Sequence, residues 1–263
     1  MNIIYVQSIF APNVNMLLRF VRSVSSFIDY YVKNDYKFKC VFGGYCAKEE
    51  YWLIIDELLK SVIDNYHIDI IVNRFDKNYG KAYVVNSLVE KFLTNEEYIF
   101  TADSDICYIE NQPNIIYRLV EAMNYSKAIN LNPSLISLYQ EEANCHILNA
   151  CYENRHYYNG KYGSEMVCHP TNAGGVAGGC LFISTNFWKI VNGYKVLGVY
   201  AADDANIMID SRKNGYNFLM SNSIRCIHPK ETDKKYQDWK IKTSSKIQSL
   251  PDAIKDANLF WDK

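Results

Sequence analysis

The chain has 263 residues, of which 49% are hydrophobic and 22% charged, an ordinary balance for a soluble globular protein. Its 28 Lys and Arg nearly match its 29 Asp and Glu, so the overall charge gives no general attraction to nucleic acid or to anionic membranes. No uncharged apolar run approaches the ~20 residues that span a bilayer, and the N-terminus lacks the features of a secretory signal. We therefore expect a soluble, cytoplasmic protein with no transmembrane segment, whose cysteines are buried free thiols.

Apolar strands alternate with amphipathic helices through the first hundred residues. The pattern predicts strands at 2–10, 38–42, 68–72 and 98–102, and helices at 14–32, 48–63 and 80–93. Alternation of this kind favours an α/β fold with a mixed, mostly parallel central sheet flanked by helices. Residues 130–172 are dense in Tyr, Asn, His and Gly, and we expect them to form an irregular insertion that covers the substrate.

An acidic pair follows the fourth predicted strand, as Asp103-Ser104-Asp105. Side chains alternate along a strand, so Asp103 and Asp105 are expected to point the same way. Two converging carboxylates repel each other unless a hard divalent cation such as Mg²⁺ or Mn²⁺ lies between them and bridges to phosphates. An Asp-Ser-Asp turn without a metal is the ordinary alternative.

A second group of polar residues surrounds the start of the third predicted helix. Gly80 and Lys81 open this helix, whose free N–H groups and dipole favour an anion, and Lys81 adds a positive charge. Asn78 and Asn86 lie on either side. A turn glycine followed by a solvated lysine is the alternative interpretation.

Two further patterns occupy the second half of the chain. Four glycines between 174 and 179 precede an apolar strand, which lets the backbone pass close to a ligand or to another strand. Asp203 and Asp204 open a predicted helix, where they can complement its dipole or one of them can act as a general base. His228 follows a strand and is either a surface histidine or the completion of an Asp/His metal site.

In this order, these motifs resemble the nucleotide-sugar glycosyltransferases of the GT-A fold, especially the family-2-like inverting group. The resemblance runs from the first strand to about Pro229. It implies a single GT-A (Rossmann-like) glycosyltransferase domain over 1–263. Within it, 1–110 would be the nucleotide-sugar-binding half, 111–229 the acceptor-binding and catalytic half, and 230–263 a basic C-terminal extension.

The resemblance also implies a role for each residue. A divalent cation, Mn²⁺ or Mg²⁺, would be bound by Asp103, Asp105 and His228, and Asp204 would be the catalytic base. The donor or nucleotide would be bound by Asp76, Asn78, Gly80, Lys81, Asn86, Asp103 and Ser104. The wall between donor and acceptor would consist of Gly178, Gly179 and Asp203. Asp76 is included because the family's Asp-Asp-Gly-Ser after the second strand is replaced here by Gly43-Gly44-Tyr45.

The implied reaction transfers a sugar from a nucleotide diphosphate sugar, UDP-linked, to a hydroxyl group of a glycan, with inversion. Basic residues between 211 and 246 leave open a phage-type DNA glycosyltransferase, with a hydroxymethylated base in DNA as the acceptor. Two other classes remain: a haloacid-dehalogenase-like phosphatase, whose nucleophilic Asp-x-Asp normally ends the first strand, and a non-catalytic sugar-binding protein. The aromatic residues expected either to bind sugar rings or to form the core of a lid are Tyr139, Tyr152, His156, Tyr157, Tyr158 and Tyr162.

Overall fold

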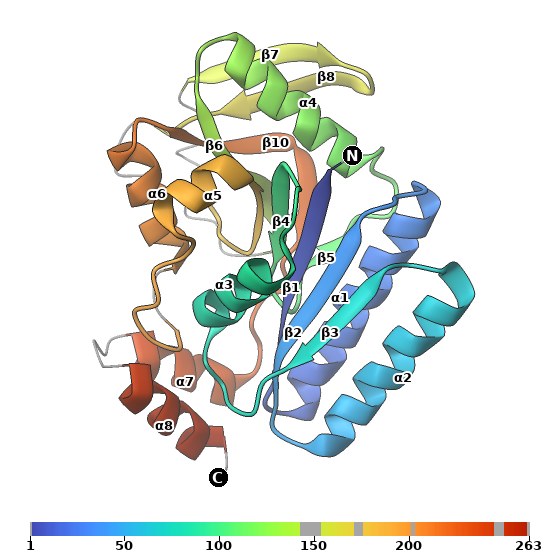
Figure 1. Ribbon diagram of the computed structural model, residues 1–263, viewed down its shortest axis with the longest axis vertical. Coiled ribbons are helices and arrows are strands. Elements are labelled where there is room, and N and C mark those ends of the chain that lie inside the picture. The colour runs from blue at the N-terminus through green and yellow to red at the C-terminus, as the bar shows by residue number, and fades with distance from the viewer. Residues whose placement is uncertain (1, 143–153, 171–175, 201–202, 245–249, 262–263) are drawn as a thin grey trace.

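The structure is a computed structural model that describes residues 2–142, 154–170, 176–200, 203–244 and 250–261. Its centre is one sheet, ten-stranded over the described residues, with the order β3-β2-β1-β4-β9-β6-β10-β8-β7, and β5 paired to β10 (Figure 1). The strands are β1 (Ile3–Ala11), β2 (Lys39–Cys46), β3 (Ile70–Arg74), β4 (Tyr98–Ala102), β5 (Cys107–Tyr108), β6 (Pro133–Glu141), β7 (Arg155–Gly160), β8 (Gly163–Cys168), β9 (Cys180–Ser184) and β10 (Asn217–Ile227).

The pairings give most strands a common direction. β3, β2, β1 and β4 are parallel neighbours, and β9 runs opposite to both β4 and β6. β6 therefore runs the same way as β4, and β10 is parallel to β6. β8 and β5 are antiparallel to β10, and β7 is antiparallel to β8. The predicted α/β class and the mixed, mostly parallel sheet are confirmed.

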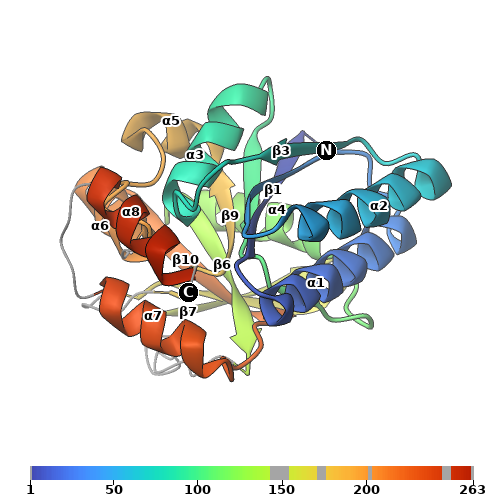
Figure 2. The ribbon, with the colours of Figure 1, turned by 90° about the horizontal axis from the view of Figure 1, so that it is seen from below.

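Helices cover both faces of the sheet (Figures 1 and 2). They are α1 (Val14–Lys33), α2 (Glu49–Tyr66), α3 (Lys81–Phe92), α4 (Ile115–Ala128), α5 (Thr185–Val191), α6 (Asp203–Lys213), α7 (Lys234–Ser244) and α8 (Leu250–Trp261). Alternate residues of β1 enter different cores, because successive side chains of a strand point to opposite faces. Ile3 and Tyr5 pack with α1, α2 and α4, whereas Ile4 and Val6 pack with α3, α5 and α6.

The first βα unit shows how local sequence sets the elements. β1 is buried along nearly its whole length, as expected for a central parallel strand covered on both faces. β1 ends at Ala11, and Asn13 then caps α1, because its side chain accepts a hydrogen bond from the Met16 N–H at 3.0 Å. Leu17, Phe20 and Val24 then form the buried face of α1 at helical spacing.

The prediction for residues 130–172 is wrong for the part that the structure describes. Residues 133–141 form β6, which lies between β9 and β10 in the middle of the sheet. Residues 155–160 and 163–168 form the β7–β8 hairpin at one end of the sheet (Figure 1). Residues 143–153, which include Tyr152, and residues 171–172 lie outside the described residues.

The C-terminal helices α7 and α8 lie together beyond the carboxyl end of β1 (Figures 1 and 2). They form a third core with Met16 and Val199. No helix among the described residues has the length and apolar character needed to cross a membrane. The prediction of free thiols is confirmed for the cysteines that the structure describes, which are Cys40, Cys46, Cys107, Cys168, Cys180 and Cys226, all of them buried.

Candidate functional site

A pocket of about 490 Å³ opens where β1 and β4 end. Ligands of open α/β sheets bind in this place, beyond the carboxyl ends of parallel strands. The segment before β9, the starts of α3 and α6, and α7 complete its walls. The predicted site residues that line it are Asn78, Gly80, Lys81, Asp103, Ser104, Asp105, Gly178, Gly179, Asp203, Asp204 and His228.

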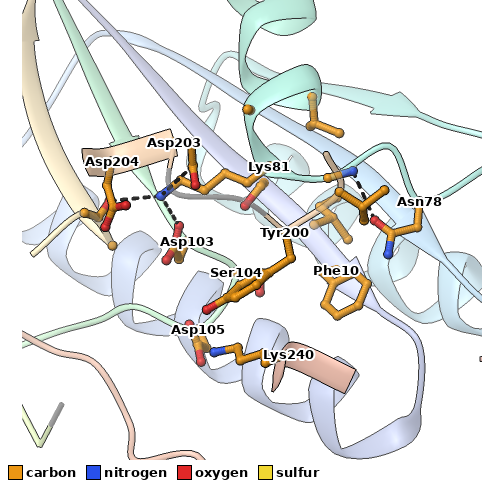
Figure 3. A pocket seen from close by; sticks show the side chains of 18 of the residues that line it. Phe10, Asn78, Lys81, Asp103, Ser104, Asp105, Tyr200, Asp203, Asp204 and Lys240 are labelled. Atoms are coloured by element: carbon orange, nitrogen blue, oxygen red, sulfur yellow. Dashed lines mark hydrogen bonds and ion pairs between the residues drawn. The ribbon is translucent and has the colours of Figure 1, made fainter. Parts of the chain in front are cut away.

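Lys81 joins the separate parts of the pocket. Its Nζ lies 2.7 Å from Asp103 Oδ1 and 3.8 Å from Asp203 Oδ2, and it donates a hydrogen bond to the Gly178 carbonyl at 2.9 Å (Figure 3). Burial alone lowers the pKa of this ammonium group, but the two carboxylates raise the pKa well above its usual value. Lys81 therefore stays charged and draws the end of β4, the glycine segment and α6 together.

Asp203 and Asp204 form the first turn of α6, where negative charge complements the helix dipole. Burial, with added repulsion from Asp204 and Asp103, raises the pKa of Asp203 to about 6, although Lys81 acts in the opposite direction. Asp204 accepts a hydrogen bond from the Ala205 N–H at 2.8 Å through Oδ1. The two acids thus differ in their surroundings: one faces Lys81, and the other lies against Gly178.

The raised pKa of Asp203 predicts how its removal changes stability with pH. The folded protein holds this proton more tightly than the unfolded chain, whose Asp pKa is about 3.9, so wild-type stability falls as pH rises from about 4 to 6. The Asp203→Asn variant lacks this loss. Relative to wild type, we expect it to gain roughly 1–3 kcal/mol in unfolding free energy between pH 4 and 7.5, measured by urea denaturation. Asp64→Asn, on the exposed side of α2, controls for the lost charge; a pH-independent difference for Asp203→Asn contradicts the assignment.

The expectation that Asp103 and Asp105 point the same way is wrong. β4 ends at Ala102, so strand alternation does not extend into the turn that carries the two acids. Asp103 is directed toward Lys81, whereas Asp105 lies on the other side of the pocket (Figure 3). Asp105 Oδ1 is 3.5 Å from His228 Nε2, and its Oδ2 is 3.5 Å from an Arg19 guanidinium nitrogen.

His228 and Asp105 nevertheless form a defined pair. Gln140 lies 3.0 Å from His228 Nδ1 and fixes the ring so that Nε2 faces Asp105. Burial raises the pKa of Asp105, but His228, followed by Lys240 and Arg19, lowers it below the usual value. Burial likewise lowers the pKa of His228, and Asp105 more than offsets this, so the net pKa is raised. Within the described residues, no three His, Cys, Asp or Glu side chains gather around one metal position, so the predicted set of three ligands is not assembled.

Two glycines are required where backbones meet beside the pocket. A Cβ on Gly178 would lie 2.1 Å from the Asp204 Cβ, so only glycine lets α6 begin this close to the segment before β9. Gly80 has a φ of +83°, and a Cβ there would lie 2.2 Å from the Val199 carbonyl oxygen. The glycine-rich sequence thus lets the segment before β9 pass close to the start of α6 at Asp204.

Two predicted donor-binding residues lie outside the pocket lining. Asn86 is directed into the protein, where its amide donates to the Tyr194 carbonyl at 2.8 Å and accepts from the Tyr194 N–H at 2.9 Å. Asp76 accepts a hydrogen bond from the Tyr79 hydroxyl at 2.9 Å near the surface. The structure therefore gives Asn86 the role of holding the segment after α5.

Other lining residues were not identified from the sequence. They include Phe10, Gln140, Lys195, Tyr200, Tyr236 and Trp239, whereas Lys240, which also lines the pocket, belongs to the basic residues between 211 and 246 noted in the sequence. Phe10 directly precedes Ala11, the last residue of β1. Its place at the end of a central strand could have indicated that it lines a pocket there. Tyr236, Trp239 and Lys240 share one face of α7 at helical spacing, but nothing in their spacing says that this face meets the pocket. The expected acceptor-binding aromatics Tyr139, His156, Tyr157, Tyr158 and Tyr162 do not line it.

The sheet order and this pocket define the GT-A fold, the α/β fold of nucleotide-sugar glycosyltransferases. Two solved structures show the likeness. S. aureus TarS 1–349 in complex with UDP-GlcNAc matches with a TM-score of 0.57 and 11% identity, over 89% of this chain and 60% of that chain. GalNAc-T7 with UDP, GalNAc and Mn²⁺ matches with a TM-score of 0.59 and 14% identity, over 99% of this chain and 54% of that chain.

The present chain thus covers less than two thirds of each of these two solved chains. At this level of identity the likeness establishes the fold. No protein-family model and no curated protein matches the sequence.

Proposed function

We propose that the protein is a glycosyltransferase that moves a sugar from a nucleoside diphosphate sugar, UDP-linked, to a hydroxyl group of a glycan. One observation carries the proposal. In a GT-A fold, a single pocket brings together the Asp103–Asp105 turn, the start of α3 and the paired acids that open α6. The TarS structure that shares this fold contains UDP-GlcNAc, and the GalNAc-T7 structure contains UDP, GalNAc and Mn²⁺.

The donor half of the pocket suits an anionic nucleotide. Gly80 precedes α3 and provides no side-chain cap, so the first N–H groups of the helix remain for other acceptors. Asn78 and Ser104 line the same region and supply hydrogen-bonding groups. Lys81, held by Asp103 and Asp203, keeps positive charge at the base of the pocket.

Asp105 and His228 fit a divalent cation as a two-residue donor set. Their facing atoms are 3.5 Å apart. The Gln140 side-chain oxygen accepts from the Gly179 and Cys180 N–H groups, so its NH₂ group donates to His228 Nδ1 at 3.0 Å, and a cation bound at Nε2 would displace the proton there. Mg²⁺ and Mn²⁺ commonly take few protein ligands and complete their coordination with water and phosphate oxygens. When bound, such an ion would offset charge developing on the departing diphosphate.

Asp204 is the proposed general base. Asp203 faces Lys81, so Asp204 is the acid of the pair that remains available to an acceptor hydroxyl group. In the proposed step, Asp204 takes the proton of that hydroxyl as its oxygen attacks the anomeric carbon. The bond between this carbon and the diphosphate breaks, and the nucleoside diphosphate leaves with the bonding electrons. Attack opposite to the leaving group inverts the anomeric configuration.

A thermal-shift screen of UDP-sugars with and without Mn²⁺ tests the donor and the metal together. Ligand at about 100 times its Kd stabilises the folded state by about 2.7 kcal/mol, which raises Tm by roughly 5–10 °C in a chain of this size. We expect Asp105→Ala to abolish the additional shift that Mn²⁺ gives. Asp64→Ala, an exposed acid on α2, should leave it unchanged. A wild-type protein that no UDP-sugar stabilises, with or without Mn²⁺, contradicts the proposed donor class.

A further inference from the structure

The C-terminal helix α7 contributes a wall of the pocket to which the proposed function assigns no role. Tyr236, Trp239 and Lys240 line the pocket from this helix, and Phe10 and Tyr200 meet them there. The rings of Phe10 and Trp239 stack with centroids 5.5 Å apart, and those of Tyr236 and Trp239 stack at 5.6 Å. These ring contacts hold the end of β1 and the helix α7 against each other.

Polar contacts fix the start of α7 as well. Asp233 accepts a hydrogen bond from the Tyr236 N–H at 3.0 Å and another from the Asn13 side chain at 3.1 Å. Arg19 donates to the Lys230 carbonyl at 3.0 Å and pairs with Glu231 at 3.2 Å. The side chains that α7 presents to the pocket therefore come from an anchored helix.

Lys240 differs from the other two lysines of the pocket. Lys81 is paired with Asp103 at 2.7 Å, and Lys195 with Asp210 at 2.6 Å. Over the described part of the chain, no carboxylate forms an ion pair with Lys240. Its Nζ lies 4.5 Å from the Tyr236 ring centroid and 5.3 Å from that of Tyr200. Aromatic faces attract a cation but do not neutralise it. Lys240 also lowers the pKa of Asp105 from a distance, but without a direct ion pair its ammonium group can still bind an anionic ligand.

The position of Lys240 fits the phosphates of the donor. Its side chain extends into the pocket on the side of Asp105, across from Lys81 (Figure 3). An anion between these two lysines would lie beside the Asp105–His228 pair proposed for the cation. A diphosphate there would meet Lys240 on one side and the proposed divalent cation on the other, and lysine binds phosphate as a point charge.

We propose that Lys240 binds the diphosphate group of the donor, so that α7 completes the donor site. The inference rests on the proposed function and deepens it by naming the diphosphate as the ligand of this wall. The Tyr200 and Tyr236 rings hold the ammonium group in place before the nucleotide binds. Lys240 is thus a further residue of the pocket that selects nucleoside diphosphates over nucleosides.

The test measures the affinities of UDP, UMP and uridine by calorimetry in the presence of Mn²⁺. We expect Lys240→Met to weaken UDP binding by ~10- to 100-fold, since a hydrogen bond to a charged group is lost. Uridine affinity should not change, and Lys240→Arg should restore most of the UDP affinity. Lys234→Met, an exposed lysine at the start of α7, removes the same charge outside the pocket and should bind UDP like wild type.

Each other outcome overturns the inference in a distinguishable way. Wild-type UDP affinity in Lys240→Met means that Lys240 does not contact the diphosphate, while the proposed function stands. An equal loss for UDP, UMP and uridine assigns Lys240 a purely structural role in α7. A wild-type protein that binds none of the three ligands contradicts the proposed function itself.

Discussion

The Asp204→Asn variant should bind the donor like wild type and lose about 10²- to 10⁴-fold in turnover, the usual contribution of a general base. The amide is nearly isosteric and can still accept the Ala205 N–H hydrogen bond, so the start of α6 should stay in place. Turnover is measured as UDP release from the UDP-sugar that gives the largest thermal shift, with water as the acceptor. Donor affinity is measured separately by calorimetry.

Two variants make this result specific. Glu90→Gln, an exposed acid on α3, should leave turnover unchanged. Asp203→Asn removes the neighbouring acid, which faces Lys81, and should reduce turnover less than Asp204→Asn does. Full turnover in Asp204→Asn with a large loss in Asp203→Asn would transfer the role of base to Asp203.

Lys81→Met should destabilise the protein, because Asp103 and Asp203 would then remain buried without their cation. Removing one partner of a fully buried pair costs about 3–5 kcal/mol, and the partial exposure of this cluster reduces the expected loss to roughly 1–3 kcal/mol. The loss should be greater at pH 8 than at pH 4, since Asp203, whose pKa is raised to about 6, is charged at pH 8 and protonated at pH 4. Urea denaturation at the two pH values measures both effects.

An exposed pair in the same chain provides the control. Lys37 Nζ also lies 2.7 Å from a carboxylate, that of Asp35, but both side chains are at least 80% exposed. Lys37→Met should therefore change stability only slightly at either pH. Equal losses for Lys37→Met and Lys81→Met would mean that burial does not strengthen the Lys81 contacts.

The parts of the site that could be predicted are the residues at the ends of predicted strands and helices. Asp103, Lys81 and the Asp203–Asp204 pair lie at the ends of elements whose periodicity is clear in the sequence, and parallel strands bring such ends to one edge of the sheet. The direction of Asp105 could not be predicted in the same way. Strand alternation applies only up to Ala102, and the turn after it depends on contacts with distant residues. One such contact is the Gln7 side chain, which donates to the Asp103 carbonyl at 2.9 Å.

Non-local packing explains the remaining differences. The segment 133–141 pairs with β9, which begins about forty residues later, and with β10, so its place in the sheet is not encoded nearby. Asn86 was expected to bind the donor, because it matches a position of the motif at the start of α3. Its partner, however, is the backbone of Tyr194, which is distant in the sequence. Lys240 reaches the pocket because α7 packs on Phe10, which is distant in the sequence.

Arg19 connects the C-terminal segment to the acidic turn that carries Asp105. The same guanidinium group contacts Asp105 and Glu231, so the acidic turn after β4 is tethered to residues that follow the last strand. A polypeptide shortened to end at Pro229 would retain the sheet and every aspartate of the pocket. It would also expose Phe10, Met16 and Val199 to water and leave the pocket open along one side. Fragments used for binding or crystallisation work therefore need to extend through α8.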